Sequence, residues 1–415
     1  MVYDVMEFME KKFREMNKDE RLEYIIRKTN LSEDSIDVIR HAVAAEKTMD
    51  TANDALMGEN HIFFSKQSIG IAPKIIVNGI ETVAPMLTEE PSVIAAASHG
   101  AKMTEKHGGF RVTNKFNNPH VTIGQIQLVG IKEEEVESAM QRILEHQDEL
   151  IALANKASPS LVASGGGILE INAKKKNTRT GIQIIVDFRA DCRDAMGANA
   201  VSKMAEAMAP EIERITNGNA VGRILSNLAV DRVVICEAVF DKDMLALKKH
   251  INGKDIEISG EEMIDRIVSL SAWAEADQFR ATTHNKGIMN GITAVAMALG
   301  QDTRAIEAAA HSYAAYGRDY SPLSYFERTK DGNLFGRLEV PIPVGIIGGI
   351  IKTNKTVKAC VEMTKCKSPA ELAALIAAVG LAQNVSALRM LAGEGITSGH
   401  LPLHNLMRKS AEEKR

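Results

Sequence analysis

The spacing of apolar and polar positions divides the first part of the chain into helices followed by a sheet. An apolar repeat of helical period follows Asn17 and Asp19, either of which can cap a helix, and another repeat begins after Ser32. The chain then changes to β-forming residues, and Asn78-Gly79 separates two apolar runs in the manner of a hairpin turn. We therefore predict three short helices, the third over 49–57, and then a sheet that begins with a hairpin.

The middle of the chain shows a regular order of elements. From 112 to 228 the pattern is strand, helix, strand, strand, helix, strand, which is typical of a ferredoxin-like or split βαβ domain. Helical patterns dominate afterwards, interrupted by a strand pair at Tyr325 and 334–340. We predict an α+β protein in which a large, mostly helical domain is interrupted by an inserted ferredoxin-like domain. The expected bounds are 1–114 and 230–398 for the large domain, 115–229 for the insert and 399–415 for a C-terminal segment.

Composition narrows the class of protein. Hydrophobic residues make up 45% of the 415 positions and charged residues 25%, which is ordinary for a globular protein, and a net charge of −4 gives no reason to expect nucleic acid as a partner. Apolar stretches such as 341–351 are shorter than the roughly 20 residues that span a bilayer, and the start lacks a signal peptide. The four cysteines form no CxxC pair, so we expect buried thiols and no metal. We expect a cytoplasmic protein without a membrane partner.

The segment RATTHNKGIMNG, residues 280–291, carries the densest group of polar candidates. Arg280, His284 and Lys286 precede an apolar helical pattern that begins at Ile288. If the helix begins there, its polar donors converge on its N-terminus, a position suited to an anionic group or a developing oxyanion. Lys286 is then the electrophilic group. The alternative is a solvated lysine in a loop.

Two further candidates lie at predicted helix starts. Asp302 precedes TRAIEAAAHSYAA and reads as an N-cap. If the preceding helix spans about twelve residues, Lys286 and Asp302 lie nearly ~20 Å apart along its axis, so any pairing is tertiary or between subunits. Glu89 and Glu90 precede another helix, and if both carboxylates are buried close together we expect the pKa of one to be raised. A solvated pair favoured by the helix dipole is the alternative.

Histidines and glycines supply weaker signals. His400 and His404 have the spacing of a helical metal site, but Pro402 between them and the absence of a neighbouring acid or cysteine argue against a metal. One histidine beside glycines fits a mobile acid or base. The glycine turns at 164–167 and 194–199 are able to hold a diphosphate on backbone N–H groups, although neither has the GxGxxG pattern.

Together these segments resemble the class II 3-hydroxy-3-methylglutaryl-CoA (HMG-CoA) reductases. The resemblance runs from Glu20 to His404, and its motifs follow in the family's order. They are EEPSVIAAAS at Glu89, GGF at Gly108, GGG at Gly165, RDAMGAN at Arg193, RILSNLA at Arg223, ATTHNKGIMNGI at Ala281, GQDTRAIEAAAHSYA at Gly300, PIPVGIIGG at Pro341, VGLAQN at Val379 and GHLPLH at Gly399.

The resemblance implies an oxidoreductase with four catalytic groups. The reaction is two hydride transfers from NAD(P)H to the thioester of HMG-CoA, which give mevalonate and free CoA, or the reverse. The resemblance implies that Lys286 beside Asp302 stabilises charge on the carbonyl oxygen, that His400 protonates the departing thiolate, and that Glu90 protonates the aldehyde oxygen. None of the four is substituted in this chain.

The resemblance also implies the binding residues and the partners. The hydroxymethylglutaryl pocket takes Ser92, Arg280, Thr283 and Asn290, and the dinucleotide takes Glu170, Asp194, Met196, Gly197 and Asn199. Glu170 favours NADH, because a carboxylate accepts from the ribose 2′-OH and repels a 2′-phosphate. NADPH stays open through the basic hairpin tip Lys174, Lys175, Lys176 and Arg179. The family implies a homodimer with active sites at the subunit interface, with a higher oligomer open.

Two segments depart from the family pattern. The first is the family's ENVIG motif, which reads Glu59-Asn60-His61-Ile62-Phe63 here and is followed by Phe64. The second is the C-terminal segment, where eleven residues follow His404 and the family has a longer mobile flap. The shortened flap raises the alternative of a catalytically impaired protein that binds a CoA thioester. Retention of the four catalytic groups favours the enzyme, and a dehydrogenase of another small substrate leaves the HNKG and GH motifs unexplained.

Overall fold

The computed structural model describes residues 15–28, 32–46, 60, 62, 67–251, 254–393 and 395. It divides into two compact units, 1–68 with 352–355 and 69–351 with 356–415. The first contains α2 (Lys18–Lys28) and α3 (Glu33–Glu46). Asn17 and Glu20 cap α2 reciprocally, since each side chain accepts from the other's backbone N–H, and Ser32 caps α3 through the N–H of Ser35. These two predicted helix starts are confirmed, with Asn17 as the cap of α2, whereas the third predicted helix, over 49–57, lies outside the described residues.

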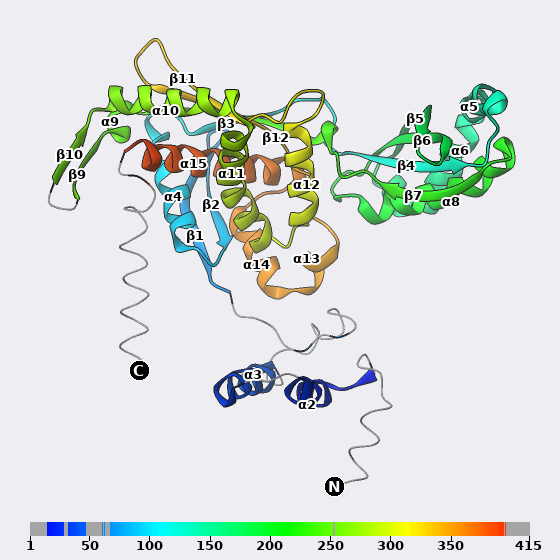
Figure 1. Ribbon diagram of the computed structural model, residues 1–415, viewed down its shortest axis with the longest axis horizontal. Helices are drawn as coiled ribbons and strands as arrows, with labels where there is room; N and C mark the ends of the chain where they lie inside the picture. Colours follow the sequence, from blue (N-terminus) through cyan, green and yellow to red (C-terminus); the bar gives the residue numbers. More distant parts are fainter. Residues whose placement is uncertain are drawn as a thin grey trace, which may run out of the picture. The chain divides into compact units, whose positions relative to one another are not determined.

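A six-stranded sheet forms the centre of the second unit (Figure 1). Its order is β11-β12-β8-β3-β1-β2, with β1 at Ile69–Val77, β2 at Ile80–Leu87, β3 at Phe110–Asn114, β8 at Val233–Phe240, β11 at Ser324–Arg328 and β12 at Leu334–Pro341. Asn78 and Gly79 join β1 to β2 with φ values of 49° and 80°, the left-handed conformation of a type I′ turn. The predicted hairpin is confirmed, whereas β3 and β8 are strands that the sequence prediction lacks.

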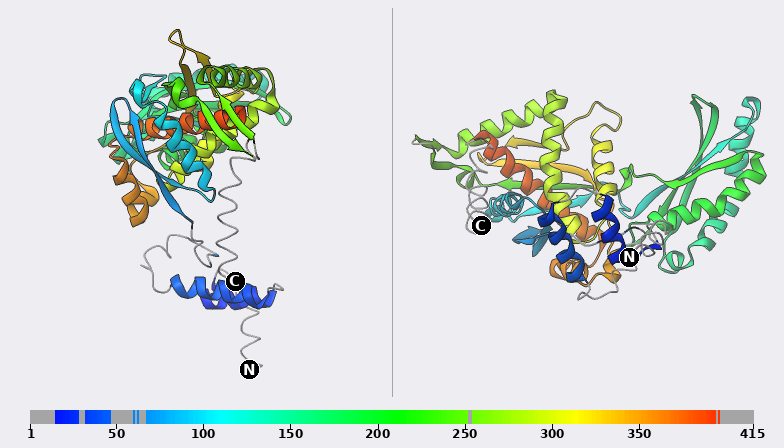
Figure 2. Two further views of the ribbon diagram at one scale, coloured as in Figure 1. Left: turned by 90° about the vertical axis from the view of Figure 1, so that its left-hand side faces the viewer. Right: turned by 60° about the horizontal axis from the view of Figure 1, so that its bottom comes forward.

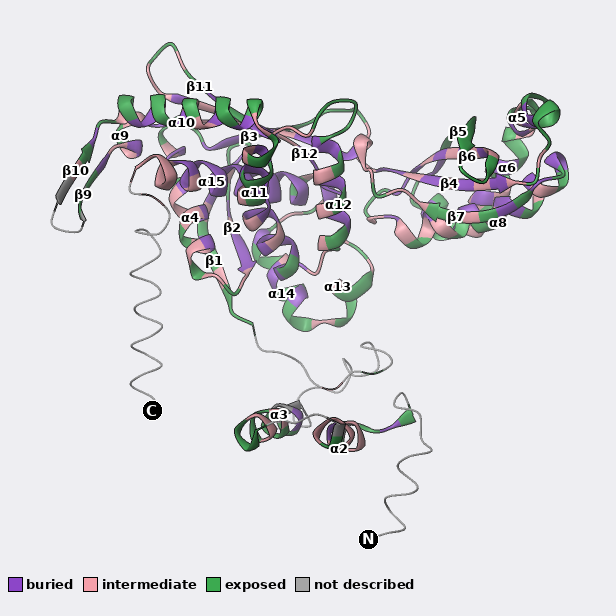
Figure 3. Ribbon diagram, in the orientation of Figure 1, coloured by how far each residue is buried: buried purple, intermediate pink, exposed green. Residues whose placement is uncertain are grey.

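Helices cover this sheet, and α15 is the most enclosed of them (Figures 2 and 3). The set comprises α4 (Pro91–Lys102), α10 (Gly260–Ala276), α11 (Gln278–Ala298), α12 (Thr303–Ala314) and α15 (Pro369–Ala392). Two further helices, α13 (Gly349–Thr353) and α14 (Lys355–Thr364), precede α15 in the chain. α15 packs against strands on one side and against α4 and α11 on the other. It is long and apolar enough to cross a bilayer, but 89% of its most apolar window is buried in the protein. This burial is what a core helix shows, because a helix enclosed by protein is apolar on nearly every face.

A second sheet has its own hydrophobic core. Its order is β5-β6-β4-β7, with β4 at Val121–Val129, β5 at Gly167–Thr178, β6 at Gly181–Asp191 and β7 at Asn219–Leu225. The two helix-linked strand pairs, β4 with β5 and β6 with β7, are each separated by one strand, which confirms the predicted split βαβ order. Its helices are α5 (Val136–Glu145), α6 (Gln147–Ala157), α7 (Pro159–Ala163) and α8 (Ala198–Thr216). The single helix expected before β5 is thus broken, and α5 gives way to α6 at His146.

Short elements complete the described chain. They are the 3-10 turns at Glu105–His107, Glu133–Glu135 and Val230–Arg232, the helix α9 (Lys242–Leu245), and the paired strands β9 (Leu247–Ile251) and β10 (Lys254–Ile258). The cysteines are free, and three of the four, Cys192, Cys236 and Cys360, are buried. Burial raises the pKa of the Cys192, Cys236 and Cys360 thiols. The expectation of buried thiols is confirmed for these three, and Cys366 is half-buried.

Candidate active site

Helix α11 carries Lys286, but not at its N-terminus. The helix begins at Gln278, because Asp277 caps it by accepting from the N–H of Arg280 at 2.7 Å. The whole of RATTHNKGIMNG is therefore helical, and Lys286 stands exposed in the third turn. The expected convergence of polar donors on a helix N-terminus at this segment is wrong. Any stabilisation of an anion by Lys286 comes from its ammonium group and not from the end of the helix dipole.

A cleft of about 370 Å³ brings Glu90, Lys286 and Asn290 together. Within α11, the spacing of Lys286, Asn290 and Thr293 places all three on one face. The wall of the cleft is formed by Leu87, Thr88, Glu89, Glu90, Val93, Lys286, Met289, Asn290, Thr293, Ala294, Met297, Glu307 and His311. The cleft thus combines a primary ammonium, an amide and carboxylates, the groups that polarise and protonate a carbonyl oxygen.

Glu90 owes its place to the start of α4. It is the N-cap, and its carboxylate accepts from the N–H of Ser92 at 3.2 Å, while Pro91 occupies the first helical position. Glu90 is half-buried and Glu89 is exposed, so the two carboxylates do not share a buried site. The cap fixes the Glu90 side chain at the cleft. Ser92 lies in the first turn of α4, outside the cleft lining.

A hydrogen-bonded network on the α12 side of the cleft was not predicted from the sequence. Asn285 donates to the hydroxyl of Tyr320 at 3.1 Å, and that hydroxyl lies 2.8 Å from Nδ1 of His311. Nε2 of His311 and the hydroxyl of Thr293 contact the two carboxylate oxygens of Glu307 at 3.1 and 2.7 Å. The hydrogen bonds from His311 and Thr293 lower the pKa of Glu307, so this wall carries an ionised carboxylate. The spacing of Glu307 and His311 on one helix face was the available sequence signal.

Asp302 lies at the N-terminus of α12. Its carboxylate caps the helix by accepting from the N–H of Ala305 at 3.1 Å and forms an exposed ion pair with Arg304. The predicted N-cap is confirmed. Asp302 is not among the residues that line the cleft with Lys286. His400 and His404 lie outside the described residues, as do Glu59, His61, Phe63 and Phe64.

Arg280 and Thr283 occupy the turns of α11 that precede Lys286, outside the cleft lining. Arg280 is half-buried, with its guanidinium 5.7 Å from the ring centroid of Trp273. Burial lowers the pKa of Arg280. Thr283 is exposed, and its hydroxyl donates to the carbonyl of Phe279 at 3.2 Å.

The predicted cofactor loop precedes α8. Gly197 is the N-cap of α8 with φ of 104°, and a Cβ on it would lie 2.4 Å from Sγ of Cys192, so only glycine fits. Two hydrogen bonds hold the loop before Gly197. The hydroxyl of Thr122 donates to the carbonyl of Met196 at 3.0 Å, and the N–H of Ile346 donates to the carbonyl of Asp194 at 2.9 Å. Asn199 follows in the first turn of α8. Gly197 has no side chain to cap the first N–H groups, which suits the start of α8 to a diphosphate.

Glu170 lies on β5 at a register irregularity and pairs with Arg189 on β6. Nε of Arg189 also donates to Asp231 at 2.8 Å. In the basic hairpin tip, Lys174 pairs with Asp187, and Lys175 lies 3.4 Å from Glu133. Two of the four basic side chains at the tip therefore already have carboxylate partners.

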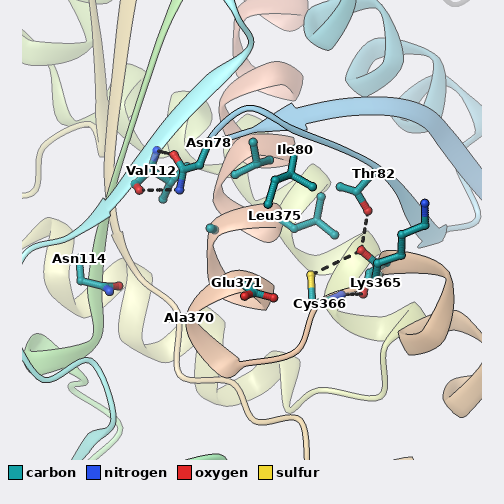
Figure 4. Close-up of a pocket in the computed structure, with 13 residues that line it drawn as sticks. Asn78, Ile80, Thr82, Val112, Asn114, Lys365, Cys366, Ala370, Glu371 and Leu375 are labelled. Atoms are coloured by element: carbon teal, nitrogen blue, oxygen red, sulfur yellow. Dashed lines mark hydrogen bonds between the residues drawn. The ribbon is translucent and has the colours of Figure 1, made fainter.

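A second cavity of about 210 Å³ lies apart from these residues (Figure 4). It is bounded by the β1–β2 turn, by β3 and by the start of α15. The hydroxyl of Thr82 donates to the carbonyl of Thr364 at 2.5 Å, and the thiol of Cys366 lies 3.8 Å from the same oxygen. No predicted site residue lines this cavity, so the cleft at Lys286 is the candidate active site.

Comparison with known proteins identifies the family. The family model described as hydroxymethylglutaryl-coenzyme A reductase matches residues 17–405. The chain belongs to this family. The 3-hydroxy-3-methylglutaryl-coenzyme A reductase of Archaeoglobus fulgidus is 42% identical over 392 residues, which cover 94% of this chain and 84% of the relative. A probable HMG-CoA reductase of Borreliella burgdorferi is 32% identical, over 84% of this chain and 76% of that protein.

Solved structures of HMG-CoA reductases share the fold. The reductase of Streptococcus pneumoniae superposes with a TM-score of 0.76 and 33% identity, over 96% of this chain and 89% of that one. A class II enzyme of the same organism, bound to NADPH in open conformations, gives 0.75 and 33%, over 92% and 98%. The α+β fold class and the resemblance to HMG-CoA reductases are thus confirmed. The chain is a member of an oxidoreductase family that uses a nicotinamide cofactor.

Proposed function

We propose that this chain reduces the thioester of HMG-CoA to mevalonate and free CoA with two molecules of NAD(P)H. The observation that carries the proposal is the convergence of Glu90, Lys286 and Asn290 in one cleft. They come from the β2–α4 junction and from α11, and each matches a site residue of the family. A carbonyl reduction needs a cation at the developing oxyanion and a nearby proton donor, and these residues supply both.

The chain's own residues perform defined tasks in this proposal. The ammonium of Lys286 stabilises negative charge on the carbonyl oxygen in both reductions, and Asn290, one turn further along α11, orients the same part of the substrate. Glu90 supplies the proton to the aldehyde oxygen, held at the cleft by its role as N-cap. The nicotinamide, when bound, supplies the hydride. His400 protonates the departing thiolate.

Asp302 reaches the site from a second copy of the chain in this proposal. Its position at the far end of α12, outside the cleft lining, supports a homodimer with the active site at the interface. Two large side chains near the junction of α10 and α11 give that region an apolar surface for the partner: Trp273 at the end of α10 is 53% exposed, and Phe279 at the start of α11 is 89% exposed. We expect Phe279→Asp to dissociate the dimer in sedimentation velocity and to lower activity, and an unchanged dimer would contradict this assignment.

The dinucleotide lies along the loop that contains Asp194, Met196 and Gly197, with Asn199 at the start of α8 and the ribose at Glu170. We propose NADH as the better cofactor, because a carboxylate at Glu170 accepts from a 2′-OH. The ion pairs of Lys174 and Lys175 support this choice, since paired ammonium groups are less available to a 2′-phosphate. The ratio of kcat/KM for NADH and NADPH measures the preference, and Glu170→Gln should shift it toward NADPH.

We also propose the division into a large domain, 1–114 and 230–398, an inserted domain, 115–229, and a C-terminal segment, 399–415, and a cytoplasmic location. Two separate hydrophobic cores support the boundary between the first two. Limited proteolysis tests the boundary between the large and the inserted domain, because proteases cleave most readily in segments where few contacts connect two domains.

The proposed activity is tested by the oxidation of NADH or NADPH in the presence of HMG-CoA. Lys286→Ala should lower kcat at least about 100-fold, since it removes the charge that stabilises the oxyanion. Lys358→Ala is the matched control, because Lys358 is an exposed lysine of α14 whose contact is a 4.0 Å ion pair with Glu362. Near-normal turnover by Lys286→Ala would overturn the proposed mechanism.

A further inference from the structure

The side of α11 that faces away from Lys286 carries two buried polar atoms without a hydrogen-bond partner among the described residues. They are Nε of Arg280 and Nδ1 of His284. The two residues are four positions apart on one helix, a spacing that places their Cβ atoms about 5–6 Å apart. His284 is only 1% exposed, so bulk water does not satisfy its ring. Buried polar atoms of this kind need an explanation, because leaving them unpaired is costly.

Neighbouring residues determine which nitrogen of His284 carries the hydrogen. The hydroxyl of Ser324 donates its single hydrogen to Oδ1 of Asn384 at 2.7 Å. The same hydroxyl lies 2.6 Å from Nε2 of His284, so it accepts there and Nε2 is the protonated nitrogen. Nδ1 therefore presents a lone pair. Burial, and next to it the positive charge of Arg280, lower the pKa of His284 to about 3, which keeps the ring neutral.

Arg280 presents the complementary atom. Its Nε–H is always a donor, because the guanidinium stays protonated in proteins. Its guanidinium carbon lies over the ring of Trp273, and this cation–π contact favours a limited set of positions for the group. An unpaired acceptor and an unpaired donor thus lie on side chains one helical turn apart, and a hydrogen bond between them would satisfy both.

We propose that His284 is a positioning residue for substrate binding, which accepts from Nε–H of Arg280 and thereby turns the outer edge of the guanidinium toward the carboxylate of the substrate. The inference rests on the proposed function and on the family resemblance, which assigns Arg280 to the hydroxymethylglutaryl pocket, where a guanidinium is suited to bind the substrate carboxylate. With Nε held by His284, both Nη atoms are left for a bidentate pair with that carboxylate. The group is oriented in advance, so less rotational freedom is lost when the substrate binds.

Two amide substitutions separate this role from simple filling of the core. The oxygen of Asn at position 284 lies near the place of Nδ1, whereas the longer Gln reaches the place of Nε2 and Ser324 and leaves no acceptor for Arg280. We expect His284→Gln to raise the KM for HMG-CoA roughly tenfold or more, the worth of one hydrogen bond to a charged group. The kcat and the KM for the dinucleotide should change less than about twofold, because the lost hydrogen bond orients only the group that binds the substrate carboxylate. His284→Asn should recover most of the lost affinity.

Ser324→Ala provides a test that leaves His284 in place. It removes the acceptor that fixes the tautomer, so a share of the molecules carries hydrogen on Nδ1 and repels Nε–H of Arg280. We expect a severalfold rise in the KM for HMG-CoA, with retained circular dichroism and melting temperature checked for each variant. If a variant at 284 fails to fold, Ser324→Ala decides the question.

Arg280→Ala is the background that separates failure of the inference from failure of the proposed function. In that background His284→Gln should have no further effect on the KM for HMG-CoA, because the group it positions is gone. Equal KM values for His284→Asn and His284→Gln, or a loss in kcat instead of affinity, would overturn the positioning role while leaving Arg280 as the carboxylate ligand. An unchanged KM in Arg280→Ala would instead overturn the ligand assignment, and the positioning role with it.

Discussion

Asp277 and Gly291 decide together where Lys286 lies. Asp277 begins α11 three turns before the apolar pattern does, and Gly291 lets the helix continue against α15, where a Cβ would lie 2.9 Å from Cβ of Gln383. The sequence signal at Gly291 was therefore one of close packing and not of a helix start. As a result Lys286 faces the cleft from the side of α11, and the remaining polar residues of the segment divide between that side and the opposite one.

At the residue scale, the buried ring of His284 predicts a pH dependence of stability. Its pKa is about 3 in the folded chain, below the ordinary 6.5, so the unfolded chain binds a proton that the folded chain excludes. The free energy of unfolding should rise with pH between about 3 and 6.5 and fall as acid is added. At pH 5 this group alone costs about 2 kcal/mol relative to pH 7, since each pH unit below the ordinary pKa costs about 1.4 kcal/mol.

Urea unfolding at pH 5, 6 and 7 measures this dependence, and His284→Asn is the control because an amide does not titrate. The difference in unfolding free energy between the wild type and His284→Asn should change by about 2 kcal/mol from pH 7 to pH 5. The same difference at each pH would show that His284 is protonated equally in the folded and unfolded chains.

At the element scale, turn and cap residues in the sequence predicted the elements that depend on them, whereas elements that depend on tertiary packing were missed. Asn78-Gly79 forms its turn because both residues accept positive φ, and the caps at Asn17 and Ser32 need neighbours only three residues away. β8 escaped prediction because its residues VVICEAVF are apolar at every position except Glu237, so the sequence shows no alternation of apolar and polar residues, although burial alternates along most of the strand.

The candidate site divides in the same way. Glu90 and Lys286 are found from motifs, because each motif is a continuous segment of the chain. The wall made by Glu307, His311 and Tyr320 depends on the antiparallel return of α12 beside α11, which no local pattern encodes. Periodicity gives the face of a helix but not the element that it meets.

The contact between α4 and α15 gives a prediction at this scale. A Cβ on Gly100 would lie 2.0 Å from the carbonyl oxygen of Ala382, and backbone cannot yield as a flexible side chain does. Gly100→Ala should lower the unfolding free energy by about 1–3 kcal/mol through overpacking. It should also lower kcat, because displacement of α4 moves Glu90 at its N-cap.

Gly287→Ala is the matched control, since that glycine is also helical and has open space around its Cβ position. Alanine there should raise the unfolding free energy by about 0.5–1 kcal/mol through helix propensity. Thermal unfolding and the NAD(P)H assay report both effects. If Gly100→Ala melts at or above the wild-type temperature, the two helices are not held at the separation seen in the structure.

At the scale of the whole molecule, one buried arginine ties the cofactor loop to both sheets. Arg232 is 3% exposed, and it donates to the carbonyls of His120 and Val121 at the start of β4, to Val344 after β12, and to Ala195 in the loop. Burial lowers the pKa of this guanidinium, and its hydrogen bonds to the carbonyls offset part of the cost of enclosing the charge. The position of the loop relative to the six-stranded sheet depends on this side chain.

Arg232→Met should therefore affect the cofactor more than the substrate. Loss of the guanidinium leaves buried carbonyls unpaired, which lowers the unfolding free energy by about 3 kcal/mol or more. The KM for the dinucleotide should rise severalfold while the KM for HMG-CoA changes little, and calorimetry should resolve two transitions where the wild type shows one. Arg214→Met is the control, because that guanidinium is exposed on α8 and pairs with Glu211. If Arg232→Met instead shows a single transition and equal changes in both KM values, the cores of the two sheets are coupled through the surrounding packing. Arg232 would then only fill space between them.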